Sequence, residues 1–291
     1  KGRIDHMDVN LKARIIYMAA LGNNTLEVID IANGKLLHSI SGLDEPQGVG
    51  YIPQHNEIIV ANGGNGDCYF YSAATFEKVA TVHLASDADD VRVDSAAKKI
   101  YVGYGKGGIA VIDADTHQQV GDVQLPAHPE GFQIDKALNQ LYVNLPDAGI
   151  VGVIDLKEMK LTAKWPNNNL AANFPMAIDT VQHHVFIGYR KPARLVVMNA
   201  RNNQFISSLD IVGDTDDLYY DNRSHTVYIS GGEGAINLFR ENGSTYKQIA
   251  NVPTRSGART SLLIPQLKLF AVAARPAQGQ PAALLVYHLQ P

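Results

Sequence analysis

The residues of this sequence that are best suited to chemistry recur in one column of a repeat whose unit is 41 to 44 residues long. That column holds an imidazole, several carboxylates and a guanidinium, whereas a purely structural repeat would favour one small residue throughout. Its seven members are His6, Gly48, Asp90, Gly131, Pro175, Asp217 and Arg259. The residues immediately before them are Asp5, Gln47, Asp89, Glu130, Phe174, Asp216 and Ala258. A fold that gathers the repeats around one axis would bring these side chains together as a candidate site.

Three chemistries fit this column. His6, Asp90, Glu130 and Asp217 offer imidazole nitrogen and carboxylate oxygen atoms, which Zn²⁺, Mn²⁺ and Ca²⁺ accept as ligands, so the first is a divalent metal ion as cofactor. The second is acid–base catalysis without a metal, with His6 or a crowded carboxylate as the base and Arg259 binding an anionic substrate. The third is structural, because opposite charges in a narrow space also pair with one another. The sequence leaves all three open.

A second group of polar and aromatic residues is expected beside this column. Tyr104, Asn144, Tyr189 and Arg190 lie in the segments between the second and third strand signals of their repeats. These loops should lie at the same end of the fold as the column, so the four residues are candidates for substrate binding. The alternative for the two tyrosines is that their rings cover the core of a repeat.

The repeat itself predicts the elements that position these residues. Each unit contains four short runs of β-branched and aromatic residues separated by turn residues, and no run has a sustained helical period. The second run is marked by segments such as IYV at residues 100–102, and the third by LEVID at residues 26–30 and IAVID at residues 109–113. Four strands in a unit of roughly 40–45 residues are typical of a propeller blade.

The sequence therefore predicts an all-β fold, a seven-bladed β-propeller of four-stranded antiparallel blades, in a single domain over residues 1–291. The blades are expected to begin near residues 5, 47, 89, 130, 174, 216 and 258. The last blade lacks its outer strand, because the sequence reaches Pro291 directly after the third strand signal. Counting back one repeat places the missing strand just upstream of Lys1, so we expect an N-terminal extension to supply it or the blade to have three strands.

The composition of the chain excludes several classes of binding partner. The 291 residues are 45% hydrophobic and 19% charged with a formal net charge of −4, which argues against a basic nucleic-acid-binding surface. No apolar run approaches the roughly 18 residues needed to cross a bilayer, so no membrane association is expected. Cys68 is the only cysteine, which excludes a disulfide framework and a thiolate metal cluster within the chain. The remaining partners are a small-molecule ligand or a protein.

The segments KKIYVGYGKGGIAVIDADTHQQVGDVQL and RIIYMAALGNNTLEVIDIANGKLLHSI resemble the YVTN/YncE-like family of bacterial β-propeller repeats, although the strands read YVGY, YVNL, FIGY and YISG instead of the literal tetrapeptide. The resemblance covers essentially the whole chain and extends to lactonase-like propellers. It implies a periplasmic or secreted protein whose signal peptide is absent from this chain. It also implies a small-molecule or metal site at one mouth of a central channel, with lactonase-like hydrolase or lyase activity on a small polar substrate. The alternative is a propeller that binds a ligand or protein without catalysis.

Overall fold

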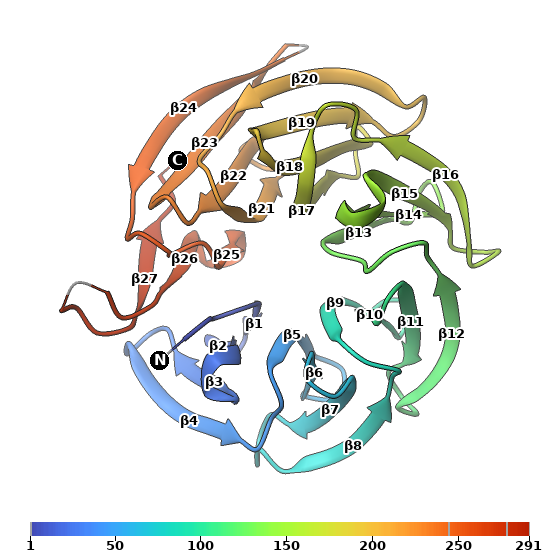
Figure 1. Ribbon diagram of the computed structural model, residues 1–291. Helices are drawn as coiled ribbons and strands as arrows, with labels where there is room; N and C mark the ends of the chain where they lie inside the picture. The colour runs from blue at the N-terminus through green and yellow to red at the C-terminus, as the bar shows by residue number, and fades with distance from the viewer. Residues whose placement is uncertain (1, 244, 278, 291) are drawn as a thin grey trace. The chain divides into compact units, whose positions relative to one another are not determined.

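The computed structural model describes residues 2–243, 245–277 and 279–290, and the chain forms two compact units, Lys1–Pro129 and Glu130–Pro291. Each unit consists of consecutive antiparallel sheets, here called blades one to seven in chain order, and Figure 1 shows them by label. Within a blade, every strand pairs with the one that follows it in the sequence. This simple order follows from the short turns between the strand segments, which favour hairpins over crossovers.

The first unit contains blades one to three. Its strands are β1 (Met7–Asn10), β2 (Ile15–Ala20), β3 (Thr25–Asp30) and β4 (Lys35–Ser41) in blade one; β5 (Pro46–Ile52), β6 (Glu57–Asn62), β7 (Asp67–Ser72) and β8 (Lys78–His83) in blade two; and β9 (Ala88–Asp94), β10 (Lys99–Tyr104), β11 (Gly108–Asp113) and β12 (Gln118–Gln124) in blade three.

The second unit contains blades four to seven. Its strands are β13 (Phe132–Asp135), β14 (Gln140–Leu145), β15 (Ile150–Asp155) and β16 (Lys160–Pro166) in blade four; β17 (Ala171–Asp179), β18 (His184–Lys191), β19 (Ala193–Asn199) and β20 (Gln204–Asp210) in blade five; β21 (Thr215–Asp221), β22 (Thr226–Gly231), β23 (Ala235–Asn242) and β24 (Thr245–Pro253) in blade six; and β25 (Ser261–Ile264), β26 (Leu269–Ala274) and β27 (Ala283–His288) in blade seven.

The predicted architecture is confirmed. The chain is all-β with seven blades, six of them four-stranded and the last three-stranded within the described residues. Each first strand begins within three residues of its expected position. The three helical segments of the described residues are single 3₁₀ turns of three residues each: Leu21–Asn23, Pro146–Ala148 and Pro265–Leu267. None of them has the length or the apolar content of a membrane-spanning helix.

One register prediction is wrong by a single residue. The column predicted from the sequence takes the residue ten positions before the start of each second-strand marker, which is His6 for Ile16 and Arg259 for Leu269. Leu269, however, pairs with Ile264 as Ile15 pairs with Asn10 in blade one. Phe270 is therefore the residue that corresponds to Ile16. The spacing from Val227 to Phe270 is 43 residues, which lies within the range of the repeat, and the adjacent apolar residues Leu269 and Phe270 fit either register.

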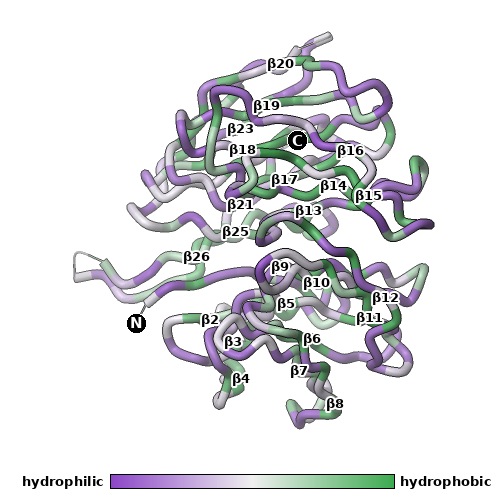
Figure 2. Tube along the Cα trace, turned by 45° about the vertical axis from the view of Figure 1, so that its right-hand side comes forward, coloured by the Kyte–Doolittle hydropathy of each residue, from purple (hydrophilic) through white to green (hydrophobic). Residues whose placement is uncertain are grey.

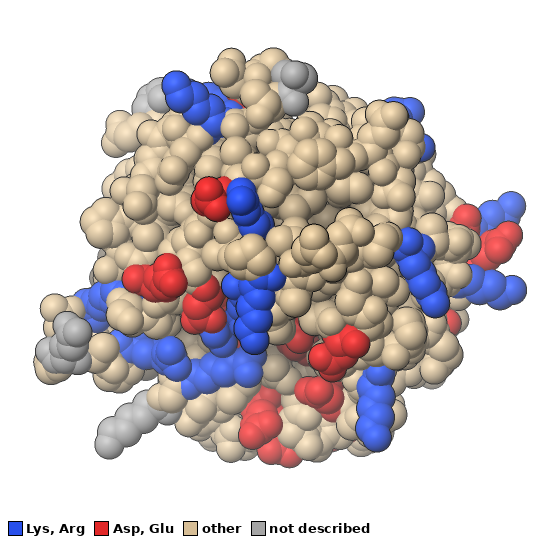
Figure 3. Space-filling model, turned by 45° about the horizontal axis from the view of Figure 1, so that its top comes forward, with Lys and Arg blue, Asp and Glu red and all other residues tan. Residues whose placement is uncertain are grey.

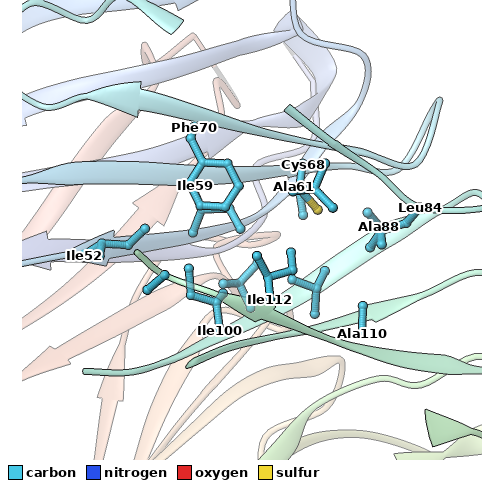
Figure 4. Packing of buried hydrophobic residues seen from close by; sticks show 14 residues of the cluster. Ile52, Ile59, Ala61, Cys68, Phe70, Leu84, Ala88, Ile100, Ala110 and Ile112 are labelled. Carbon is cyan, nitrogen blue, oxygen red and sulfur yellow. The ribbon is translucent and has the colours of Figure 1, made fainter. Parts of the chain in front are cut away.

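The core lies between the blades of each unit. In the first unit, one apolar cluster joins β5, β6 and β7 to β9, β10 and β11, and Figure 4 shows Ile59, Phe70 and Ile100 packed within it. Figure 2 shows apolar residues concentrated in the strands and hydrophilic residues in many of the turns. The outer strands are mostly exposed and typically direct one apolar residue inward, such as Ile40 of β4 and Val82 of β8. An outer strand whose side chains alternate between the core and the solvent has this pattern, because only one face of the sheet is covered there.

Candidate functional site

The candidate site residues lie at one end of each blade, which we call the loop face. The first strand begins there, and the loop between the second and third strands lies there too, because successive strands alternate in direction. In blade three, the backbone N of Gly105 in that loop donates to the carbonyl of Ser86, 2.8 Å away in the connection that leads to β9. The topology therefore gathers the sequence-predicted residues of each unit at its own loop face.

His6 lies at the loop face of the first unit, surrounded by carboxylates. Its backbone is fixed by Ala19, whose N donates to the His6 carbonyl at 3.0 Å. Its Nε2 lies 3.9, 3.6 and 4.0 Å from Oδ1 of Asp5, Asp89 and Asp90, respectively. Burial alone would lower the pKa of His6, but Asp90, Asp89 and Asp5 outweigh it and raise the pKa well above its usual value. The three carboxylates therefore favour the imidazolium form of His6.

Asp89 joins His6 to a second imidazole. His128 Nε2 lies 3.8 Å from Asp89 Oδ2, and Nδ1 of the same ring donates to the Gly105 carbonyl at 2.6 Å. Asp89 is 7% exposed, and its Oδ1 atom is buried without a hydrogen bond. Burial lowers the pKa of His128, but Asp89, the Gly105 carbonyl and Asp87 raise it to about 9. Burial likewise raises the pKa of Asp89, but the two imidazoles hold it far below its usual value.

Asp90 forms an ion pair with Arg92. Its side chain is 2% exposed, and its Oδ1 accepts a hydrogen bond from Arg92 Nη1. Arg92 Nη1 also donates to the carbonyl of Val91 at 2.9 Å. Asp89 and Asp90 both lie near His6, but Asp89 also lies near His128 and Asp90 accepts a hydrogen bond from Arg92.

A second charge network lies at the loop face of the second unit. Arg259 Nη1 lies 2.8 Å from Asp214 Oδ1, and its Nε lies 3.0 Å from Asp216 Oδ2. Arg190 donates from Nη2 to Asp216 and from Nε to the Thr215 carbonyl at 2.7 Å. The Arg190 guanidinium also stacks over the Phe174 ring at 4.0 Å. Figure 3 shows acidic and basic side chains interspersed on the face in view.

The corrected register changes the position assigned to Arg259. Ala273 N donates to the Thr260 carbonyl at 2.9 Å, as Ala19 N does to His6 and Asn144 N to Gly131. Thr260 is therefore the counterpart of His6 in blade seven, and Arg259 is the counterpart of Asp5, Asp89 and Asp216. The column before the one singled out from the sequence thus carries most of the paired charges.

The predicted metal ligands divide between the units. His6 and Asp90 belong to the first unit, whereas Glu130 and Asp217 belong to the second. Asp217 Oδ2 accepts a hydrogen bond from Ser261 N at 2.6 Å, and Glu130 N donates to the Asn144 carbonyl at 3.0 Å. Over residues 2–243, 245–277 and 279–290, no group of three or more His, Cys, Asp or Glu side chains is arranged to hold a metal ion.

The predicted substrate-binding residues are bonded to the protein itself. Asn144 is fully buried, and its Nδ2 donates to the Phe174 and Pro175 carbonyls at 2.9 and 3.2 Å. Tyr189 is 4% exposed, and its hydroxyl donates to Asn167 Oδ1 at 3.0 Å. The candidates expected in the loops lie instead at the ends of second strands, Asn144 in β14 and Tyr189 in β18. Their bonds tie these strands to β17 and to the segment that follows β16. We therefore assign both residues a structural role.

Tyr104 has a similar arrangement at the surface of blade three. Its hydroxyl donates to Asp122 Oδ1 at 2.8 Å. Its ring lies across the hairpin turn, so closely that a Cβ atom placed on Gly108 would be 2.4 Å from ring atom Cε1. The glycine is required by this approach, and Tyr104 covers the end of the blade core.

Several participants in these networks were not among the site residues chosen from the sequence. Asp214 lies in the connection before β21, outside the repeated column, and its signal was the acidic run GDTDD at residues 213–217. Asp89 and Asp216 belong to the column immediately before the chosen one. The sequence pointed to His128, in the segment PAHPEG, as a histidine that could reach this end of the fold, and it does reach Asp89 from the connection after β12. A connection has no fixed register, so the repeat period could not place it.

Comparison with known proteins identifies the fold and nothing finer. No family model matches the chain, and no curated protein matches it by sequence. Among solved structures, a chain of the mitotic checkpoint complex matches with a TM-score of 0.83 at 16% identity, covering 98% of this chain and 86% of its own. A chain of the hydrazine synthase of Kuenenia stuttgartiensis matches with a TM-score of 0.85 at 12% identity, covering 97% and 94%. This chain is a seven-bladed β-propeller.

Its structural neighbours come from an enzyme, the hydrazine synthase, and from a protein assembly, the mitotic checkpoint complex. The propeller fold alone therefore does not distinguish catalysis from binding.

Proposed function

We propose that this propeller is a non-catalytic scaffold that binds a protein partner through its loop face. The observation that carries the proposal is the pairing of Arg259 with Asp214 and Asp216 at 2.8 and 3.0 Å. The guanidinium that an anionic substrate would need is held by two carboxylates of the same unit. A substrate anion would have to compete with both carboxylates for this guanidinium.

The first unit supports the same conclusion. An imidazole that acts as a general base must be neutral before it accepts a proton, and the raised pKa of His6 favours its protonated form. His128, with a pKa of about 9, is protonated there too. Asp90, Asp89 and Asp5 surround His6, and Asp89 and Asp87 lie beside His128, so this cluster stabilises the loop face and is not poised for proton abstraction.

The comparisons and the repeat resemblance agree with binding. One structural neighbour is a subunit of an assembly named as the mitotic checkpoint complex, in which a propeller is part of a multi-protein complex. The repeats of this chain resemble those of the YVTN/YncE-like family, which has members that bind ligands or proteins. We therefore extend the proposal: the chain belongs to that family and is exported. A rigid scaffold that presents loops from successive blades is well suited to recognition.

Site-specific photo-crosslinking tests the proposal. A photoreactive residue replaces Lys106, which is exposed in the loop-face hairpin of blade three, or Lys12, which is exposed in a turn at the opposite end of blade one. Each protein is irradiated in an extract of its source organism, and the adducts are identified by mass spectrometry. We expect one discrete protein adduct from position 106, competed by excess unmodified protein, and none from position 12. Equal adducts from both positions, or none from position 106, would contradict a loop-face scaffold.

A further inference from the structure

Two arginines at the loop face of the second unit are not neutralised by the protein itself. The arginines of this unit at that face are Arg190, Arg194, Arg255, Arg259 and Arg275. Three of them form ion pairs, which are Arg190 with Asp216, Arg194 with Asp210 at 3.3 Å, and Arg259 with Asp214 at 2.8 Å. Within residues 2–243, 245–277 and 279–290, Arg255 and Arg275 have no carboxylate partner.

Arg255 is held in place by its surroundings. It lies in the connection from β24 to β25, where Thr254 N donates to the Gly234 carbonyl at 2.8 Å and Ala258 N donates to the Arg255 carbonyl at 3.0 Å. Its Nη1 donates to the Pro281 carbonyl at 2.8 Å, in the hairpin between β26 and β27. A guanidinium has five N–H donors, so the group is oriented by this bond and keeps donors for a ligand.

Arg275 is held by the same two segments in the opposite sense. It directly follows β26, in the hairpin, and its side chain lies against Gly257 of the connection. A Cβ atom placed on Gly257, whose φ is +78°, would be 2.8 Å from Arg275 Nη2. Arg255 thus reaches from the connection to the hairpin, and Arg275 reaches from the hairpin to the connection. The two guanidiniums belong to one surface.

The donors of this surface suit carboxylates better than phosphate. Phosphate sites in proteins commonly use free backbone N–H groups. In this connection the N–H groups of Thr254, Gly257 and Ala258 all donate to carbonyl groups of the protein, Gly257 N to Gly232 at 2.7 Å. Guanidinium groups remain, and these bind carboxylates through paired hydrogen bonds and are frequent anchors of protein interfaces.

We propose that the protein partner places an acidic segment, with at least two Asp or Glu side chains, on Arg255 and Arg275. The inference rests on the proposed loop-face function and adds the chemistry of the partner. It does not involve the outer edge of blade seven, where an N-terminal extension is expected. The strand order is β25-β26-β27, and Gly257 precedes β25, so Arg275 reaches away from β27 and from that edge.

A labelled peptide of six glutamates, flanked by glycines, is the probe. We expect it to bind the 291-residue protein saturably in fluorescence anisotropy at low salt, and the matching glutamine peptide not to bind. Arg255→Gln with Arg275→Gln should weaken binding at least about tenfold, because both charge-assisted contacts are lost. Binding should also weaken strongly at 0.5 M salt, since exposed charges are then screened.

The matched control removes two arginines from the opposite end of the blades. Arg14 and Arg201 lie in turns there, are exposed, and likewise have no carboxylate partner in the part of the chain that the structure describes. Arg14→Gln with Arg201→Gln changes the net charge equally and should leave the affinity within about twofold of the wild type, since these residues are far from the loop face. Circular dichroism of both double variants verifies that they are folded.

A photoreactive residue in place of Ser256, which is exposed between Arg255 and Gly257, examines the partner itself. Mass spectrometry of the adduct should identify a partner segment with two or more Asp or Glu residues. In the variant with Arg255→Gln and Arg275→Gln, the yield of this adduct should fall at least about threefold.

Three results would overturn the inference. The first is that the peptide does not bind, or binds the two double variants equally. The second is an adduct at position 256 whose partner segment is neutral or basic. The third is that the full-length gene product, with all residues upstream of Lys1, does not bind the peptide, which would assign the arginines to the chain itself. A discrete adduct from position 106 beside any of these would leave the loop-face function standing, whereas its absence counts against that function whatever the peptide does.

Discussion

Arg259 Nε lies 3.0 Å from Asp216 Oδ2, and the two residues occupy equivalent positions at the entrances of blades seven and six. A single position of the repeat thus supplies opposite charges in adjacent blades. Arg190 of blade five binds the other oxygen of the same carboxylate. Asp216 therefore connects three consecutive blades, and its charge is more important for stability than that of an isolated surface ion pair.

We predict that Asp216→Asn destabilises the protein by about 1–3 kcal/mol, because it leaves two largely buried guanidinium groups without their shared carboxylate. The measurement is urea unfolding followed by circular dichroism. The control is Asp210→Asn, which removes a carboxylate that is 89% exposed and 3.3 Å from Arg194, and should change stability by less than about 0.5 kcal/mol. Equal effects of the two substitutions would contradict a connecting role for Asp216.

The second prediction concerns alkaline pH and His128. Its pKa rises from 6.5 to about 9 on folding, so the folded protein binds more protons than the unfolded chain between these values. The stabilisation is fully present below pH 6.5 and is lost as the pH rises through about 9. It amounts to at most about 3 kcal/mol, since one pKa unit is worth about 1.4 kcal/mol.

Thermal or urea unfolding between pH 6 and pH 10 tests this. The stability of the wild type should fall across the interval, and His128→Asn should be less stable at pH 6 and have a shallower slope. His83→Asn is the control, because its side chain is 77% exposed. An unchanged slope in His128→Asn would show that its proton is not linked to folding.

The third prediction concerns Asp8, whose substitution is expected to stabilise the protein, whereas the two preceding substitutions destabilise it. Burial raises the pKa of Asp8 from 3.8 to about 6, against hydrogen bonds from the backbone N atoms of Tyr51 and Val9. The folded protein therefore binds more protons between these values, and the Asp8 contribution to stability decreases as the pH rises from about 4 to 6. Asp8→Asn keeps an oxygen acceptor and removes the charge. We expect it to raise stability by about 1–3 kcal/mol at pH 7 and to change little at pH 4.

Chemical denaturation of the wild type and of Asp8→Asn at pH 4 and pH 7 measures the difference in their free energies of unfolding. Groups that titrate equally in the two proteins do not contribute to this difference. A variant that is less stable at pH 7 would show that ionised Asp8 is needed, for instance by Arg92, whose charge lowers its pKa.

The fold could be predicted from the sequence because blade formation depends on local patterns that recur. The segments at residues 26–30 and 109–113 have the same apolar alternation and the same terminal aspartate, and both form third strands. The site could not be predicted in the same detail. Nothing in the sequence shows that Asp89 faces His6 and His128 while Asp90 binds Arg92, because contacts between blades depend on the relative twist of adjacent sheets. The one-residue register error in blade seven has another cause: the adjacent apolar residues Leu269 and Phe270 fit either register, and this moved Arg259 into the wrong column.

The last prediction concerns Cys68, the only cysteine of the chain. Its side chain is fully buried in the cluster between blades two and three, opposite Val82, and burial raises the pKa of the thiol. The thiolate is the reactive form, so a buried thiol with a raised pKa reacts only when the blade opens. We expect no reaction with Ellman's reagent at pH 8 over minutes in the native protein and one equivalent in urea. Because reaction requires opening, Phe70→Leu, which loosens the same cluster, should accelerate labelling at least about tenfold, whereas Phe205→Leu on an exposed strand should not. Rapid stoichiometric labelling of the native wild type would mean that the core between these blades is open to solvent.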